Sequence, residues 1–176
     1  MGSDIETTAL LDEAVKRSGL VWLRWSEPPR TRAFWHSWLG GHAYLLTGRG
    51  EQPDPRLDED EPVEVIVRSK DSAQRLVVFS AYATRLRPRD HDWREATASL
   101  ATARLNLADS ARAPQRWATD DETTIYRLTP GGHLLERPGS YSDESGRATP
   151  VRTPATTTGR PRRVLHRRGS SRSPPS

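Results

Sequence analysis

The sequence predicts a β-rich α+β domain over residues 1–136. We expect a small barrel of five to six antiparallel strands, an N-terminal helix and one helix before the last strand, followed by a disordered tail at 137–176. Three observations support this prediction: short apolar runs separated by Gly and Pro, a long run at 75–86 that is apolar on both faces, and a sharp change of composition near residue 136.

The N-terminal helix is predicted over Ile5–Arg17. Leu10, Leu11, Ala14 and Val15 fall on one helical face, and charged residues fall on the other. Ser18-Gly19 follows, and glycine is favoured just past a helix end. The helix therefore covers a core with one side only.

A strand at Leu20–Trp25 precedes a predicted hairpin. Two β-prone runs, Ala33–Leu39 and His42–Thr47, are separated by Gly40-Gly41. Tight hairpin turns need positive φ angles, which glycine adopts without strain. These two runs are therefore expected to pair with each other.

A long loop at 48–61 leads to a strand at Val63–Arg68, a turn at Lys70–Ala73 and a long strand at Arg75–Leu86. In the long strand, Leu76, Val78 and Tyr82 share one face while Val77, Phe79 and Ala81 share the other. Both faces need cover, which favours a curved sheet closed into a barrel with helices outside it.

The second helix is predicted from Asp90 or Asp92 to about Leu107. Asp92 and Glu95 have the spacing of a capping box. The expected buried stripe consists of Trp93, Ala96, Leu100, Ala103 and Leu107. A loop through Pro114 then leads to a last strand, Thr123–Leu128, which we expect Pro130-Gly131-Gly132 to end.

The tail differs from the domain in composition and charge. Of the 40 residues at 137–176, 22 are Pro, Ser, Thr or Gly, and too few apolar side chains remain to form a core. Residues 1–136 carry 18 basic and 21 acidic side chains, a net of −3, whereas the tail carries 9 and 2, a net of +7. Association with nucleic acid, non-specific and salt-dependent, is therefore expected only through the tail, around Arg160–Arg168.

Several classes of protein are disfavoured. Without cysteine there is no disulfide or thiolate chemistry. No apolar run is long enough for a membrane span and no signal-peptide pattern occurs, so we expect a cytoplasmic protein that does not bind membranes. His36 and His42 flank the glycine pair as potential cross-strand neighbours, but two ligands do not make a metal site, and none is predicted. No nucleophile motif occurs, so the catalytic residues are unknown.

The segment Thr47-Gly48-Arg49 is the candidate binding loop. A strand that ends in Thr-Gly and is followed by Arg can offer a hydroxyl, backbone N–H groups and a guanidinium to a phosphate. The spacing is neither that of a P-loop nor that of a dinucleotide fingerprint. The alternative is an ordinary connection in which the glycines only allow the chain to turn.

Four tryptophans at positions 22, 25, 35 and 38 lie on the first strands. Aromatic side chains can stack on a flat ring system, although they more often fill a core or an interface.

The order of elements resembles the flavin-binding split barrel of the pyridoxamine 5′-phosphate oxidase-like superfamily. The segments that carry the resemblance span roughly Glu6 to Pro130, and three of them, 45–53, 65–71 and 103–107, together with 126–130, are similar to an uncharacterised actinobacterial branch of it. The resemblance implies a split β-barrel and a homodimer with FMN or F420 at the subunit interface. It also implies an oxidoreductase that acts on a small-molecule substrate, which is unknown.

On the family pattern, Thr47, Gly48, Arg49 and Arg32 would contact the cofactor phosphate and Trp38 would lie near the ring. Thr47 matches the family motif, but Glu51, Gln52 and Pro53 replace the later phosphate-binding positions. A carboxylate near a phosphate repels it unless it points away or is paired with Arg49. The alternative function is therefore a non-catalytic dimeric ligand-binding or interaction module that has lost its cofactor.

Overall fold

The computed structural model describes residues 2–25, 30–72, 74–104, 107 and 109–141. The tail that the sequence predicts to be disordered lies, from residue 142 on, outside the described residues, as does Ala73 of the predicted turn.

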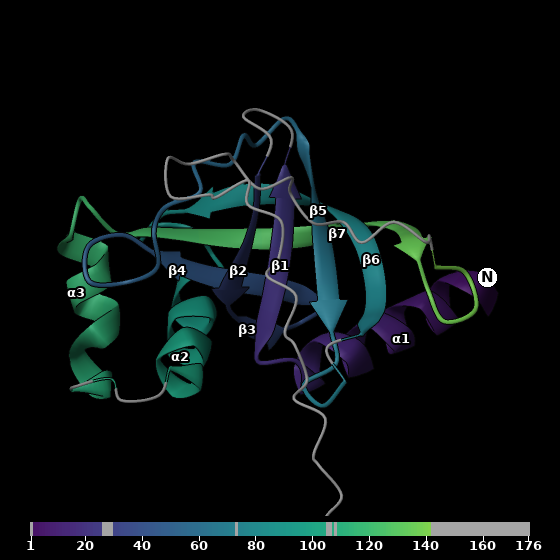
Figure 1. Cartoon of the computed structure of the whole chain (residues 1–176). Helices are drawn as coiled ribbons and strands as arrows, with labels where there is room; N and C mark the ends of the chain where they lie inside the picture. Colours follow the sequence, from purple (N-terminus) through teal and green to yellow (C-terminus); the bar gives the residue numbers. More distant parts are fainter. Residues whose placement is uncertain (1, 26–29, 73, 105–106, 108, 142–176) are drawn as a thin grey trace, which may run out of the picture.

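One curled sheet of seven antiparallel strands forms the centre of the molecule (Figure 1). Its strands follow in the order β2-β1-β5-β6-β7-β4-β3. They are β1 (Leu20–Trp25), β2 (Arg30–Trp35), β3 (Ser37–Leu39), β4 (His42–Thr47), β5 (Pro62–Arg68), β6 (Arg75–Leu86) and β7 (Thr124–Glu136). The helices are α1 (Gly2–Arg17), α2 (Trp93–Ala103) and α3 (Ala113–Thr119), with a short 3-10 turn at Ser110–Arg112. None of the described helices is both long and apolar enough to cross a membrane.

The two edges of the sheet are joined through one residue. β2 and β3 lie at opposite ends of the strand order, yet only His36 separates them in the chain. The single strand predicted over Ala33–Leu39 is thus divided, and its halves serve both edges. The predicted curled barrel is confirmed, with seven strands where five to six were expected because this strand counts twice. The predicted hairpin is also confirmed, since Leu39 pairs with His42 across Gly40-Gly41.

The main core lies on the inner face of the sheet, and α1 closes one end of it. Leu11, Ala14 and Val15 of α1 pack against inward-facing strand residues. Among these, Phe34, Leu45, Phe79 and Tyr126 are at most 1% exposed. Other members of the cluster are Val21, Leu23, Ala43, Leu57, Val63, Val65, Val67, Val77, Ala81, Ala83 and Leu128.

A second, smaller core lies on the outer face, where α2 and α3 cover β4 and β7. It contains Tyr44 and Leu46 of β4 and Ile125 of β7, packed against Leu100 of α2 and Trp117 of α3. The sequence prediction placed a loop where α3 stands and was wrong there. Pro114 is in the first turn of α3, where a proline costs no intrahelical hydrogen bond.

The predicted capping box at the start of α2 does not form. Asp92 is the N-cap residue but makes no side-chain cap bond, because its carboxylate contacts the Arg127 guanidinium on β7 instead. The helix ends at Ala103, short of Leu107. Ala103, which was expected in the buried stripe, is exposed.

The last strand does not stop at Pro130-Gly131-Gly132, contrary to prediction. β7 continues to Glu136 with two register shifts against β6. Pairing of β7 with β4 ends at Leu128, so beyond that point β7 bonds to β6 alone and one of its sides is open. A proline, which lacks an N–H group, is tolerated on such an edge.

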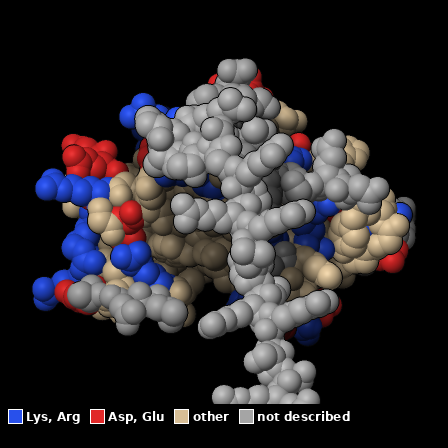
Figure 2. All heavy atoms as spheres, viewed as in Figure 1, with Lys and Arg blue, Asp and Glu red and all other residues tan. Residues whose placement is uncertain are grey.

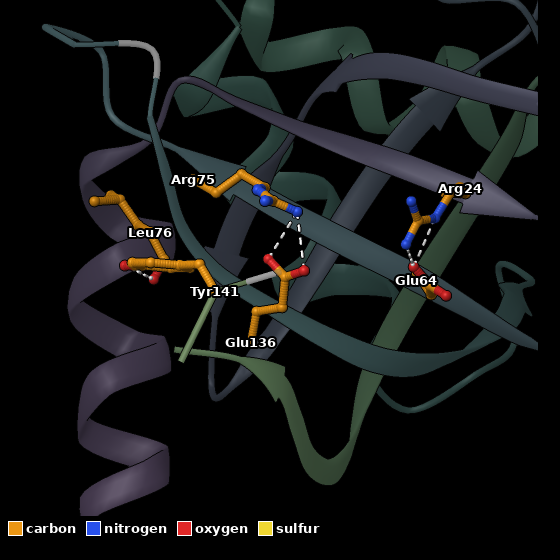
Figure 3. Close-up of polar contacts among 6 residues, drawn as sticks. All are labelled: Arg24, Glu64, Arg75, Leu76, Glu136 and Tyr141. Atoms are coloured by element: carbon orange, nitrogen blue, oxygen red, sulfur yellow. Dashed lines mark hydrogen bonds and ion pairs between the residues drawn. The ribbon is translucent and has the colours of Figure 1, made fainter. Parts of the chain in front are cut away.

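Ion pairs link neighbouring strands of the sheet, β6 with β7 and β1 with β5 (Figure 3). Arg75 Nη1 lies 2.9 Å from both carboxylate oxygens of Glu136, and both side chains are more than four-fifths buried. Arg24 Nε donates to Glu64 at 2.7 Å. The Tyr141 hydroxyl donates to the Leu76 carbonyl at 3.1 Å and thereby holds the end of the described chain against β6.

We expect Glu136→Ala to lower the free energy of unfolding by about 1–3 kcal/mol, because Arg75 would lose its charged partner in a largely buried setting. Urea denaturation measures this value. Glu122→Ala is the matched control, since Glu122 pairs with Arg49 at 3.7 Å on an exposed surface; it should cost about 0.5 kcal/mol or less. An equal loss of unfolding free energy in the two variants would show that the pairing of β6 with β7 does not depend on the Arg75–Glu136 ion pair.

Candidate functional site

The loop after β4 forms hydrogen bonds mainly to itself and to the neighbouring strand. Thr47 is fully buried, and its hydroxyl donates to the Thr124 carbonyl at 3.0 Å. The Gly48 N–H donates to the Gln52 carbonyl at 2.8 Å, and the Glu51 N–H donates to the Gly48 carbonyl at 3.1 Å. The hydroxyl and the first N–H that the sequence offered to a phosphate are therefore engaged within the protein.

Gly48 is required by close packing. Its φ is +128°, and a Cβ atom at this position would lie 2.1 Å from the Glu122 carbonyl oxygen. The backbone of residues 122–123 thus approaches the loop more closely than any side chain allows. This contact explains the glycine without a ligand.

Gln52 joins the loop to the end of β2. Its amide accepts from the Trp35 N–H at 2.7 Å and donates to the Trp35 carbonyl at 3.0 Å, as a neighbouring strand would. The same amide nitrogen lies 3.2 Å from the Leu46 carbonyl on β4. Sequence reasoning missed this role, because nothing in the local pattern shows which distant backbone groups a glutamine will reach.

Glu51 is paired with Arg104 and not with Arg49. Its side chain is 10% exposed and contacts the Arg104 guanidinium, which lies 5.6 Å from the centre of the Trp35 ring. Burial raises the pKa of the Glu51 carboxyl, and the charges of Arg104 and Arg116 oppose that shift. Arg49 is 83% exposed and faces Glu122 at 3.7 Å.

The structure separates the other two predicted site residues from this loop. Trp38 lies on β3, opposite Ala43, and its indole N–H donates to Asp12 of α1 at 2.6 Å. Thr47 lies four residue steps along β4 from Ala43, a distance of about 13 Å. Arg32 is an exposed residue on β2, opposite Leu23. The tryptophan that adjoins the loop is Trp35.

The surface around the loop carries both signs of charge. Figure 2 shows blue and red atoms interspersed at the left edge, over α3 and the loop after β4. The pairs Arg49–Glu122, Arg104–Glu51 and Arg112–Asp109 belong to this region. No continuous basic surface forms there among the described residues.

The histidines do not converge. His42 pairs across the hairpin with Leu39 and not with His36. His36 is buried at the junction of β2 and β3, and its Nε2 lies 3.3 Å from the Val15 carbonyl. In the part of the chain that the structure describes, no group of three or more potential ligands could hold a metal ion. The basic tail lies outside that part, and its binding of nucleic acid stays a prediction.

We expect Gly48→Ala to lower the free energy of unfolding by about 3 kcal/mol or more, because the new methyl group collides with the backbone at Glu122 and the φ angle is strained. Gly50→Ala is the matched control. Gly50 also has a positive φ, +74°, but nothing lies within 4 Å of the position of its Cβ. The control should cost about 1 kcal/mol. Urea denaturation of both variants tests whether packing or φ alone requires Gly48; a similar loss in both would contradict the packing argument.

Burial lowers the pKa of His36 from its ordinary 6.5 to about 4. Between these values the unfolded chain binds the proton and the folded chain does not, so stability falls as the pH drops from about 6.5 to about 4. The slope from this group is about 1.4 kcal/mol per pH unit. We expect His36→Asn to lose that slope in urea midpoints measured from pH 7 to pH 4.5. Parallel curves for the two proteins would contradict the burial of a neutral imidazole.

No protein-family model matches the sequence, and no curated protein sequence matches it. Solved structures do match the fold. HutZ, described as a heme storage protein from Vibrio cholerae, is 12% identical, with a TM-score of 0.51 over 74% of this chain and 92% of HutZ. The conserved hypothetical protein Rv2991 from Mycobacterium tuberculosis is 16% identical, with a TM-score of 0.51 over 70% and 79%.

A third structure, of a candidate pyridoxamine 5′-phosphate oxidase from Listeria innocua, is 14% identical, with a TM-score of 0.45 over 75% of this chain and 97% of that one. At such identities a structural likeness establishes the fold alone. The seven-stranded curled sheet and its likeness to HutZ and Rv2991 confirm the expected fold, a small antiparallel barrel with helices packed against it.

Proposed function

We propose that this chain is a ligand-binding or interaction module of the split-barrel fold that does not hold a phosphate-bearing cofactor at the Thr47 loop. One observation carries the proposal: the carboxylate of Glu51 lies within the candidate phosphate loop and contacts Arg104. The cation that a phosphate would need there already has an anionic partner from the chain itself.

The electrostatic cost of adding a phosphate is substantial. Two like unit charges 5 Å apart repel by about 3 kcal/mol at the effective dielectric constant typical of a protein surface. Thr47 and Gly48 offset little of this cost, because the hydroxyl of one and the N–H of the other already donate inside the protein. The residues present therefore do not fit the phosphate of FMN or F420.

The second candidate is the flavin- or deazaflavin-binding oxidoreductase that the family resemblance implies. Two observations favour it: the exposed guanidinium of Arg49, and the stacking of Arg104 on Trp35 beside the same loop. A rotation of the Glu51 side chain away from Arg104 would leave the Arg104 guanidinium available to a bound anion, and the exposed Arg49 could contact the same anion. The cofactor would supply electron or hydride transfer, and Arg49 and Arg104 would hold its phosphate.

Fold neighbours support a ligand-binding role for either candidate. HutZ is described as a heme storage protein, so a split barrel of this shape serves there to hold a large planar group. We also propose that the chain forms the homodimer that the family resemblance implies. Leu20 and Tyr82, each 47% exposed on the outer face of the sheet, are apolar surface that a second copy could cover.

A visible absorption spectrum separates the two candidates. Protein purified from an actinobacterial host, which supplies both FMN and F420, should be colourless, and excess of either cofactor should leave its melting temperature unchanged. Glu51→Ser frees Arg104 and should introduce measurable FMN binding, whereas Glu122→Ser, which frees only the exposed Arg49, should not. Stoichiometric flavin in the unmodified protein would overturn the first candidate and establish the second.

Sedimentation of the same sample, compared with 19.8 kDa for one chain, tests the dimer.

A further inference from the structure

A trough of about 750 Å³ lies along the edge of β3. One wall is the C-terminal turn of α1, with Val15, and the other is α2, with Glu95, Ala98, Thr102 and Ala103. β3 runs between the two walls as the floor. In Figure 1 the end of α1 and α2 both lie below the sheet. We call this space the β3 trough.

The floor of the β3 trough is an unpaired strand edge. β3 is the last strand in the order and bonds to β4 only. Leu39 and His42 close the two-residue hairpin and form a hydrogen-bonded pair, so by antiparallel alternation Trp38 and Ala43 form a non-bonded pair. The backbone N–H and C=O of Trp38 therefore point away from β4, and no described residue bonds to them.

Two side-chain atoms beside this edge also lack hydrogen-bond partners among the described residues. Ser37 Oγ and His36 Nδ1 are buried, and neither has a hydrogen-bond partner among the described residues. Ser37 is 4% exposed and His36 is 8% exposed, and both line the β3 trough. Buried polar atoms are nearly always bonded, so these two indicate a site that another group completes.

The α2 wall of the β3 trough is also exposed. Its residues Ala98, Thr102 and Ala103 are exposed, although the sequence placed Ala103 on a buried stripe. Small side chains on this wall leave room for a backbone to lie close to β3. An extended peptide is the ligand whose alternating N–H and C=O groups match an unpaired strand edge.

We propose that the segment Ala155–Arg160 of the chain's own tail binds in the β3 trough as an added strand. This segment is bracketed by Pro154 and Pro161 and contains Thr156-Thr157-Thr158, which are β-branched and favour extended backbone. Its side chains before Arg160 are small, which suits the narrow wall of α2. Arg160 follows the segment's only glycine, and Glu95 on the wall offers the opposite charge.

The tail is long enough to reach the trough. Tyr141 is held at Leu76, and the fourteen steps from Tyr141 to Ala155 span up to about 46 Å when extended. That exceeds the diameter of about 36 Å expected for a domain of this size. The inference goes beyond the proposed function and does not depend on it, because the β3 trough and the Thr47 loop share no residue.

Cysteine pairs test the proposal in the full-length chain, which has no cysteine of its own. Thr157→Cys combined with Ala98→Cys or with Thr102→Cys should form an intramolecular disulfide under mild oxidation. Two control pairs measure the rate of random encounter for a tail that is not docked: Thr157→Cys with Ala111→Cys, which is exposed on the 3-10 turn, and Ser171→Cys with Ala98→Cys. A free tail gives all pairs effective concentrations in the mM range, so docking should make the trough pairs at least about tenfold faster.

Equal rates in trough and control pairs would overturn the proposal, and so would disulfides that form only between two chains, which would point to a second copy as the occupant. Proline substitution then tests the strand itself. Thr158→Pro and Gly159→Pro each remove one backbone donor, on opposite sides of an extended strand, and at least one of them should reduce the trough disulfide to the control rate, whereas Thr149→Pro should not. Failure of both prolines to change the rate would overturn docking as a strand.

Discussion

The passage of the chain through His36 is the constraint on which the rest of the structure depends. Trp35 ends the strand at one edge of the sheet and Ser37 begins the strand at the other, so a single residue fixes the distance between the two edges. The sheet must therefore curl, and its curl encloses the main core that α1 caps. Burial of an uncharged imidazole at this corner, with Nε2 3.3 Å from the Val15 carbonyl, ties the corner to α1. The same corner leaves β3 as an edge strand, with no further strand paired to it among the described residues.

The loop after β4 links several elements of the barrel to one another. Gln52 bonds to both backbone groups of Trp35, Gly48 admits the backbone of Glu122, and Glu51 contacts the guanidinium that stacks on Trp35. The Gln52 amide, the Gly48 N–H and the Arg104 guanidinium are groups that could otherwise contact a phosphate. The loop donates its hydrogen bonds to other parts of the barrel. These bonds stabilise the closed sheet, and the same donors are therefore not available to a ligand. The fold is thus shared with HutZ and Rv2991, while in this chain the polar groups of the loop are directed inward.

Local patterns in the sequence predict most of the fold and little of the site. Strands such as Leu20–Trp25 and Arg75–Leu86 are predicted with their observed bounds, because alternation and flanking turn residues are local signals. α3 is missed because it forms where Trp117 packs into the second core, which no local pattern indicates. The extension of β7 past Pro130 is missed because a proline is tolerated there only since β4 no longer pairs with β7, and that follows from the tertiary structure. The Thr-Gly-Arg loop is found, but its partners are not. Arg104 is 53 residues from Glu51, and no spacing rule connects them.

The edge of β3 and the Thr47 loop differ in how their polar groups are satisfied, and that difference ranks them as sites. At the Thr47 loop, the Thr47 hydroxyl and the Gln52 amide donate to backbone carbonyls. Glu51 Oε2 and Arg104 Nε form no hydrogen bond, but the two side chains pair with each other. Along β3, Ser37 Oγ and His36 Nδ1 have no hydrogen-bond partner among the described residues. An unsatisfied buried group costs about 1–3 kcal/mol, and a bound peptide strand would recover part of that cost together with the apolar surface of the walls. The free energy for binding is therefore expected at the edge of β3, to which the family resemblance does not point.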